Sequence, residues 1–389
     1  MEPVYLDHAA STPVRPEVLE AMLPFLNAAW GNPSSSHRFG RAAKAGLEQG
    51  KREVAQSLGV EPNQVIFTSG GTEADNLAVI GAALAARAQG RSMHVVTSAI
   101  EHKAVLAAAH AVVHLGGTET ILPVDRCGML DLDALDAALA THPALVSVMW
   151  VNNEVGVVQP MADIGARCRA AGVPLHSDAV QAYGKLPIDL DAVGCSLLSI
   201  SGHKLGAPKG IGALIVRDRQ IIEAIIHGGG QQFGIRPGTE NVAGAVALGR
   251  AAVLARQELD GHVSRMIRFR NQLATRLRAT VPDIVFHCES SVRAPHLLSV
   301  SVPGAEAEAM LMHLDLAGIA CSGGSACSSG AIEPSYVLVA MGVDRSLALS
   351  TVRFSLGHET TEADIARTAD VFPGIVERVR TLGVALGRV

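Results

Sequence analysis

QVIFTSGGTEADNLAVIGAALAARAQGRSMHVVTS, residues 64–98, contains the pattern that decides the fold. Residues 64–69 form a short apolar run typical of a buried strand, and the run ends at two glycines. Residues 73–90 follow with the composition of a helix and end at Gly90, a residue that commonly terminates helices. Residues 93–98 are a second apolar run. The stretch therefore predicts a strand, a helix and another strand in succession.

The same alternation continues further along the chain. Four more apolar runs predict strands, at residues 145–151, 173–180, 195–201 and 211–216, and a helical pattern covers residues 161–172. Strands that are continuously apolar and alternate with helices favour a mostly parallel sheet covered on both faces. Because residues 211–216 follow the preceding strand so closely, an antiparallel strand is an alternative there. We predict an α/β fold for this part of the chain.

After residue 240 the pattern changes to that of a smaller α+β domain. A long helical stretch at 242–281 is followed by a strand at 296–303, a helix at 305–318, a strand at 350–357 and a final amphipathic helix. We expect residues 14–260 to form the large domain, and residues 1–13 with 261–389 to form the small one. The boundary is expected inside the long helix, between Leu259 and His262.

Composition excludes several classes of function. The chain has 389 residues, 48% of them hydrophobic, and a net charge of −5, which gives no reason to expect nucleic-acid binding. No run of apolar residues is long enough to predict a membrane span. The first residues, MEPVYLDHAASTP, lack the basic and apolar segments of a secretory signal. The six cysteines form no CxxC pair that would predict zinc. We expect a soluble protein of the cytoplasm.

Polar residues stand directly after five of the predicted strands. Ligands of such sheets bind beyond the carboxyl ends of the strands, so these residues are expected to share one site. In chain order the groups are Gly70, Gly71 and Thr72; Glu101 and His102; Asn152, Asn153 and Glu154; Asp178 and Gln181; and Gly202, His203 and Lys204.

Each of these signals has an ordinary alternative when taken alone. SGGTEADN (69–76) offers backbone N–H groups to a phosphate, or is a common helix start. Lys204 is one of only six lysines, and it is either a desolvated Schiff-base amine or a loop lysine. Asp178 suits a protonated pyridine nitrogen or a helix cap, and His102 suits ring stacking and proton transfer or a core position. Together, in this order, they predict a pyridoxal phosphate site.

The chain resembles the pyridoxal-phosphate-dependent cysteine desulfurases of the NifS/IscS type, within the class V aminotransferases. The resemblance covers nearly the whole length and implies the type I fold of these enzymes, with a seven-stranded, mostly parallel sheet in the large domain. It rests on YLDHAASTP, GNPSSSHRFG, TSGGTEADN, EHKAV, VNNEVGVVQP, HSDAVQAYGKLPIDL, SGHKLGAPKGIGAL, RPGTEN, GSACSSGAIEPSYVL and VRFSLG.

The resemblance also implies roles at the matching positions. Lys204 is similar to the lysine that holds the cofactor as a Schiff base and acts as the base at the substrate Cα. Asp178 is similar to the partner of the ring nitrogen, Gln181 to the donor to the ring O3′, and His102 to the stacking and proton-handling residue. The implied phosphate contacts are the Gly71 N–H, Thr72, Ser201 and His203.

Two further sets of contacts follow from the resemblance. Thr239 matches a phosphate contact that the family supplies from the other subunit, which implies a homodimer with shared active sites. Asn153, beside the cofactor, and Arg353 match the residues that hold the substrate carboxylate. An arginine suits that task because its planar fork binds a carboxylate through two hydrogen bonds.

CSGGSACSSGA, residues 321–331, carries the implied nucleophile. Cys327 resembles the thiol that attacks the sulfur of L-cysteine, giving L-alanine and an enzyme persulfide, and only the thiolate form can do so. The glycines and serines around it allow the thiol to reach the cofactor and then an acceptor, as in the first group of desulfurases, where this segment is extended. We interpret Cys321, six residues earlier, as a structural residue.

Some questions stay open at this level. Gln232 and Ile235 stand where the family more often has an acidic and a basic residue, which could alter the dimer interface or the mouth of the site. The sulfur acceptor could serve iron–sulfur assembly, tRNA thiolation or DNA phosphorothioation. Alternatives to a desulfurase are a selenocysteine lyase, another class V enzyme such as a transaminase, or an inactive scaffold for a sulfur-carrier protein.

Overall fold

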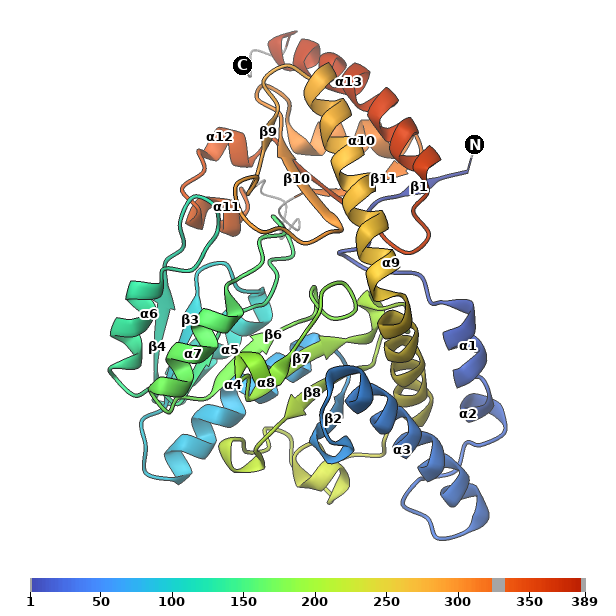
Figure 1. Cartoon of the computed structure of the whole chain (residues 1–389), viewed down its shortest axis with the longest axis vertical. Coiled ribbons are helices and arrows are strands. Elements are labelled where there is room, and N and C mark those ends of the chain that lie inside the picture. The colour runs from blue at the N-terminus through green and yellow to red at the C-terminus, as the bar shows by residue number, and fades with distance from the viewer. Residues whose placement is uncertain (1, 324–332, 386–389) are drawn as a thin grey trace.

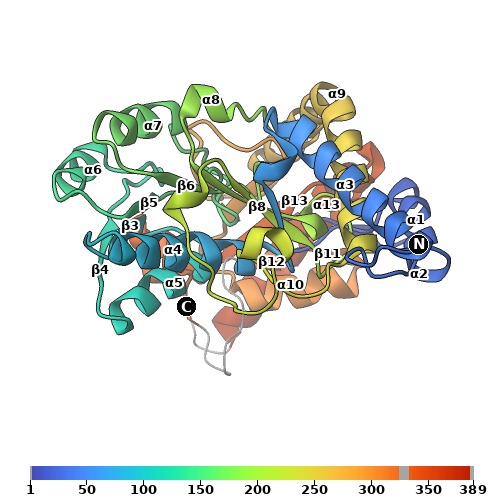
Figure 2. The same ribbon diagram turned by 90° about the horizontal axis from the view of Figure 1, so that it is seen from below.

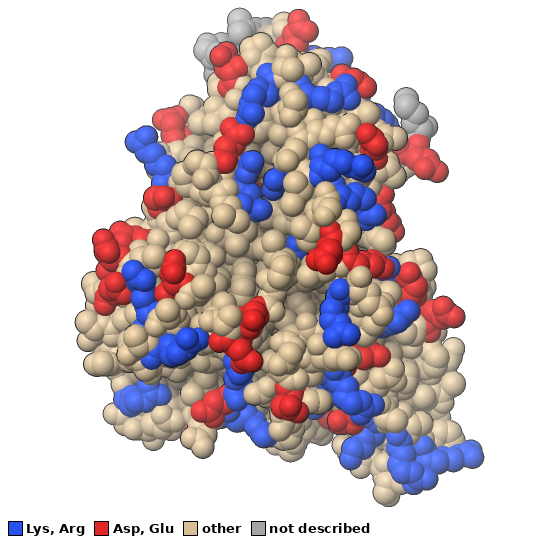
Figure 3. Space-filling view, viewed as in Figure 1, with Lys and Arg blue, Asp and Glu red and all other residues tan. Residues whose placement is uncertain are grey.

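The computed structural model describes residues 2–323 and 333–385 of the chain, with side chains as far as residue 383. Figure 1 shows two parts, a larger one around a wide sheet and a smaller one above it, joined by the long helix α9 (Val242–Thr280). None of the helices in the described residues combines the length and the apolar character that crossing a bilayer requires. On the face shown in Figure 3, acidic and basic side chains are interspersed.

The larger part is built on a seven-stranded sheet with the order β2-β8-β7-β6-β5-β3-β4. Only β8 runs against its two neighbours, and every other pairing in the sheet is parallel. The mostly parallel, seven-stranded prediction is therefore confirmed, including the antiparallel alternative for residues 211–216. The strands are β2 (Val65–Thr68), β3 (His94–Ser98), β4 (Thr118–Leu122), β5 (Leu145–Ser147), β6 (Leu175–Asp178), β7 (Leu197–Ser201) and β8 (Gly212–Val216).

Helices cover both faces of this sheet, as Figure 2 shows. On one face lie α6 (Leu132–Leu139), α7 (Met161–Ala170) and α8 (Leu190–Val193), and on the other lie α4 (Gly71–Ala88) and α5 (Lys103–His114). Successive strand residues alternate between the two cores, because side chains along a strand point to opposite faces. Phe67 and Leu198 belong to the first core, and Ile66 and Leu197 to the second.

Two strands differ from their predicted extent. β4 escaped the sequence patterns because it is a partly polar edge strand, TETIL, in which Ile121 is exposed. The apolar run at 145–151 forms a strand only as far as Ser147. Its remaining residues are buried without a regular ladder, and Val151 makes an isolated bridge to Val158. The apolar sequence at 145–151 therefore predicted burial correctly, but it did not predict where the strand ends.

The smaller part packs on the second half of α9. An antiparallel sheet has the order β12-β13-β10-β9, and β1 pairs in parallel with β11. The strands are β1 (Val4–Tyr5), β9 (Val285–Phe286), β10 (Leu297–Ser301), β11 (Ile319–Ala320), β12 (Ser322–Gly323) and β13 (Thr351–Ser355). The helices are α10 (Ala307–Leu316), α11 (Tyr336–Ala340), α12 (Arg345–Ala348) and α13 (Glu362–Ala385).

The buried residues of α9 divide between the two cores, those up to Leu254 in the first and those from Met266 in the second. We propose on this basis that the domain boundary falls between them. Three further helices pack beside the first half of α9, and short 3-10 turns lie within the connecting loops. The helices are α1 (Pro16–Met22), α2 (Pro24–Asn27) and α3 (Arg38–Leu58), and the turns are η1 (Pro62–Gln64), η2 (Gly202–Lys204), η3 (Arg219–Ile221) and η4 (Gln231–Gly234).

Candidate active site

Most of the polar residues predicted at the strand ends line one cavity of about 200 Å³, whereas Gly70, Glu101, Asn152, Glu154 and Gly202 do not line it. It lies at the carboxyl edge of the large sheet, because Asp178 ends β6 and Ser201 ends β7. Its lining consists of Ala9, Gly71, Thr72, Asp75, His102, Met149, Asn153, Asp178, Val180, Gln181, Ser201, His203 and Lys204. The structure thus brings together predicted residues that are up to 133 positions apart, from Gly71 to Lys204.

One end of the cavity is suited to an anion. The helix α4 begins there at Gly71, where an added Cβ would lie only 2.9 Å from the Val180 side chain. The free N–H groups and the dipole of a helix start attract a phosphate. The buried hydroxyl of Ser201 has no hydrogen-bond partner among the described residues. Burial, and then the nearby Lys204, lower the pKa of His203 to about 4, so its ring is neutral.

Asp178 lies further into the cavity and is 5% exposed. Its Oδ1 accepts a hydrogen bond from the Val180 N–H at 2.8 Å. Burial raises the pKa of this carboxyl, while His102, the Val180 N–H and Lys204 act in the opposite direction. Asp178 therefore makes a local turn-capping bond to the Val180 N–H and also lines the cavity, and its role toward a ring nitrogen stays a prediction.

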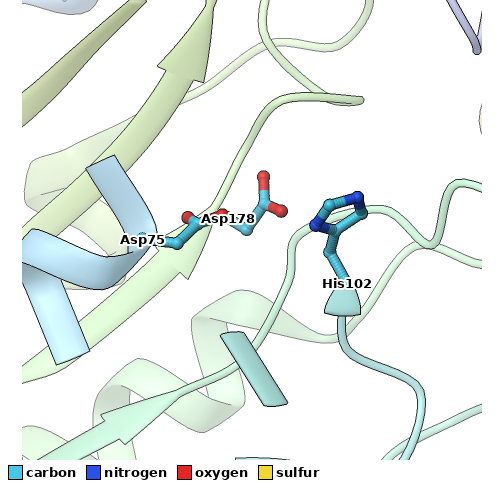
Figure 4. Close-up of side chains that lie close together, drawn as sticks. All are labelled: Asp75, His102 and Asp178. Carbon is cyan, nitrogen blue, oxygen red and sulfur yellow. The ribbon is translucent and has the colours of Figure 1, made fainter. Parts of the chain in front are cut away.

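Asp75 is the acidic cavity residue that the sequence interpretation missed, in addition to the uncharged Ala9, Met149 and Val180. It lies one helical turn beyond Gly71 on α4 and is 1% exposed. Figure 4 shows its carboxyl group beside that of Asp178, with the His102 ring on the other side of Asp178. An acid inside the alanine-rich helix of SGGTEADN was a usable signal, because a buried helix face rarely carries a carboxylate without a partner.

His102 and Lys204 approach the cavity from two loops. His102 is the N-cap of α5, and its Nδ1 accepts from the Ala104 N–H at 3.1 Å. The Lys204 ammonium donates to the carbonyl of Ala9 and, at 2.7 Å, to that of Ala10. Burial, and then Arg353, lower the pKa of Lys204 to about 8, against smaller effects of nearby acids. A large fraction of this amine is consequently neutral and nucleophilic near pH 8.

Gln181 and Asn153 are also held at the cavity. The Gln181 amide donates to the Ala9 carbonyl at 2.9 Å, and its oxygen lies 3.3 Å from Nε2 of His296. The side-chain oxygen of Asn153 is buried without a partner among the described residues. The backbone oxygen of Asn153 accepts from Arg353 at 2.8 Å. The two residues predicted to hold the substrate carboxylate are therefore neighbours, although Arg353 does not line the cavity itself.

The remaining predicted residues lie elsewhere. Thr239 is exposed and does not line the cavity of its own chain. Cys327 lies outside the described residues. Cys321 is partly buried against the second core, and burial raises the pKa of its thiol to about 12. Gln232 and Ile235 are buried, and Gln232 has a φ of 49°, in the left-handed region that a non-glycine residue rarely adopts.

The residues of the cavity fit pyridoxal phosphate. The side-chain oxygens of Asn153 and Ser201 are buried and lack partners among the described residues, which is the state expected of groups that bind a polar ligand. Groups that suit a phosphate, a buried acid and a lysine amine line the same cavity, and they match the three functional parts of this cofactor. Together, the topology of the sheet and the residues of this cavity indicate an enzyme of the pyridoxal-phosphate-dependent class.

The comparisons place the chain within that class. Residues 4–368 match the Aminotransferase class-V family. The chain is 43% identical to the cysteine desulfurase IscS of Dictyoglomus turgidum (strain DSM 6724 / Z-1310), over 97% of this chain and 96% of that protein. A solved NifS-like protein superimposes with a TM-score of 0.90 at 34% identity, covering 97% of this chain and all of the other.

A solved structure of SspA in complex with cysteine also superimposes, with a TM-score of 0.80 at 32% identity over 91% of this chain and 98% of that one. The chain belongs to the class V aminotransferase family and, within it, to the pyridoxal-phosphate-dependent cysteine desulfurases. The fold and the cofactor expected from the resemblance are thereby confirmed.

Proposed function

We propose that this chain removes the sulfur of L-cysteine, releases L-alanine and retains the sulfur as a persulfide on Cys327. The observation that carries the proposal is that Lys204, Asp178 and the start of helix α4, which suits a phosphate, meet at one cavity next to Asn153 and Arg353. Relatives of this chain are named cysteine desulfurases, which is the activity proposed here. When bound, pyridoxal phosphate supplies the electron sink that stabilises negative charge at the substrate Cα.

Lys204 is the proposed base. Its Nζ would take the Cα proton of the substrate and return it at a later step, which requires a neutral amine. The pKa of about 8 places that neutral form within reach at ordinary pH. The carbonyls of Ala9 and Ala10 would hold the amine when it is protonated.

The other cavity residues are proposed to bind and orient. Gly71, Thr72, Ser201 and His203 would hold the phosphate, and Asp178 would face the ring nitrogen. His102 would stack on the ring, and Gln181 would donate to O3′ after leaving the Ala9 carbonyl. Arg353 and Asn153 would hold the carboxylate of L-cysteine.

Sulfur transfer needs no outside oxidant or reductant. The sulfur of Cys327 forms an S–S bond as the Cβ–S bond of the substrate breaks, and the substrate carbon takes up a proton to become the methyl group of alanine. One thiol and one cysteine thus give one persulfide and one alanine. The persulfide would then pass to the thiol of a sulfur-acceptor protein by exchange.

We further propose a homodimer in which Thr239 reaches the phosphate of the partner's site. The exposed position of Thr239, outside the cavity of its own chain, supports this arrangement. A reducing compartment such as the cytoplasm suits an enzyme that depends on a free thiol.

Mass spectrometry tests the proposed function directly. The protein is incubated with L-cysteine without reductant and then digested, and the peptide that contains Cys327 should gain the mass of one sulfur atom. L-alanine should appear in the same amount in a single turnover. A persulfide on another cysteine, or alanine formed without any persulfide, would contradict the proposal. L-selenocysteine in place of L-cysteine compares the two substrates under the same conditions.

A further inference from the structure

The carboxyl groups of Asp75 and Asp178 lie beside each other in the cofactor cavity (Figure 4). One ligand atom each from Asp75, His102 and Asp178 lie within 4.8 Å of one another. Both acids are almost fully buried, at 1% and 5% exposure. Two buried carboxylates at such a separation cannot both be ionised without a large repulsion, so the pair retains a proton.

The surroundings of Asp178 favour its charged form. His102 and Lys204 both lower its pKa, and the His102 ring lies beside Asp178 on the side away from Asp75 (Figure 4). Its Oδ1 also accepts the Val180 N–H at 2.8 Å, a bond that stabilises a carboxylate more than a carboxylic acid. Asp178 is therefore the acid of the pair that carries the negative charge.

Asp75 has no comparable support. The basic group nearest to it is His176, whose Nε2 lies 3.8 Å from Asp75 Oδ1. His176 is fully buried, burial lowers its pKa to about 3, and its ring nitrogens already contact the hydroxyls of Ser147 at 2.8 Å and Ser199 at 2.9 Å. A neutral imidazole supplies no charge to a carboxylate.

The other acidic neighbours increase the cost of ionising Asp75. Burial, Asp178 and Glu101 all raise its pKa, and only a hydrogen bond with Ser199 acts against them. Within the part of the chain that the structure describes, no lysine or arginine forms an ion pair with Asp75. The proton of the pair consequently stays on Asp75.

We propose that Asp75 is a protonated positioning residue that leaves Asp178 as the single carboxylate facing the ring nitrogen of pyridoxal phosphate. This inference rests on the proposed role of Asp178. A charged Asp75 would repel Asp178 and compete for the ring proton. A protonated Asp75 instead fills the space behind Asp178 with a hydrogen-bond donor, so that the one negative charge points at the cofactor.

Infrared spectroscopy tests where the proton lies. The holoenzyme is prepared with 13C-labelled aspartate, which separates aspartic acids from Glu101, another buried acid whose pKa burial raises to about 8. At about pH 7 the wild type should have a band of a protonated carboxyl group that moves with the label, since ordinary aspartates are ionised there. The band should vanish in Asp75→Asn and persist in Asp178→Asn. Its absence from the wild type, or its survival in Asp75→Asn, would overturn the inference.

Cofactor affinity supplies the second measurement, made on the apoenzyme without substrate. Asp75→Asn keeps a neutral donor of the same shape, so the Kd for pyridoxal phosphate should rise by less than about threefold, whereas Asp178→Asn should raise it more than about tenfold. An equal loss of affinity for pyridoxal phosphate in both variants would overturn the inference about Asp75 but leave the proposed role of Asp178 standing. An unchanged Kd in Asp178→Asn would overturn the proposed role of Asp178 and this inference with it, so the two failures differ.

Discussion

The guanidinium of Arg353 donates a hydrogen bond to the carboxylate of Asp7 over 2.8 Å. The arginine proposed to hold the substrate carboxylate therefore already faces an acid of its own chain. A second bond, to the Asn153 carbonyl at 2.8 Å, fixes the fork from another side, and Nε is buried without a partner among the described residues. Arg353 is thus oriented before substrate arrives, and part of its charge is offset.

Asp7→Asn should strengthen substrate binding. The amide keeps an oxygen that accepts from Arg353 but removes the negative charge that opposes the incoming carboxylate. We expect the KM for L-cysteine to fall about threefold, with a smaller change in kcat. Arg353→Lys is the matched control and should raise KM more than about tenfold, because an ammonium cannot replace the fork. A rise of KM in Asp7→Asn would contradict the argument.

Lys204 should react as an unusually nucleophilic lysine in the cofactor-free protein. Its pKa is lowered to about 8, so the neutral amine is half-formed at that pH and the reaction rate should level off above it. Competitive labelling with acetic anhydride as a function of pH, read by mass spectrometry, measures this profile. The exposed Lys209, five residues further on, serves as the reference in the same digest. A rate for Lys204 that keeps rising well beyond pH 8 would refute the assignment.

The two cysteines of the segment at 321–331 should behave differently. Cys327→Ser should abolish persulfide formation and lower sulfide release by more than about a hundredfold, while the bound cofactor keeps its visible colour. Cys321→Ser should retain most activity, since burial raises the pKa of Cys321 to about 12 and leaves almost no thiolate. Sulfide assays with both variants show which cysteine the reaction requires. Equal losses of activity would contradict Cys327 as the single nucleophile.

Buried histidines should make the fold sensitive to acid. Burial lowers the pKa of His287 to about 4, below the value of about 6.5 in an unfolded chain, so the unfolded state binds more protons between these pH values. Stability is therefore present above pH 6.5 and lost as the pH falls, by up to about 1.4 kcal/mol per pH unit for each such group. The free energy of unfolding, measured with urea, should depend less on pH in His287→Gln than in the wild type. The control His227→Gln, at an exposed position, should keep the wild-type pH dependence. Identical pH dependence of both variants would contradict this origin.

Much of the fold was readable from the sequence because its strands are buried on both faces. Runs such as 64–69 and 195–201 are continuously apolar, which a sheet covered by helices requires, and both formed the expected strands. β4 was not readable, since an edge strand with polar residues resembles a loop. The end of β5 at Ser147 was not readable either, because burial continues past it.

The cavity was largely predictable for a similar reason. Polar residues at the ends of parallel strands converge, so Asp178 and Lys204 could be paired from the chain order alone. Contacts made by residues far apart in the chain were beyond such reasoning. The ion pair of Asp7 with Arg353 has no local signal. The acid at position 75 signals a buried partner but does not identify Asp178 as that partner, because their approach depends on how helix α4 packs on the sheet.

The sharing of active sites between subunits can be tested by mixing two variants. If Thr239 serves the partner's site, a heterodimer of Lys204→Ala and Thr239→Ala chains contains one site with both defects and one with neither. That intact site should bind pyridoxal phosphate with wild-type affinity, although a Thr239→Ala homodimer binds it more weakly, by about tenfold for one lost phosphate contact. The two chains carry different affinity tags, and the purified heterodimer is titrated with the cofactor by absorbance. Should Thr239 act within its own chain, every site of the heterodimer would be defective, and no binding of wild-type affinity would be seen.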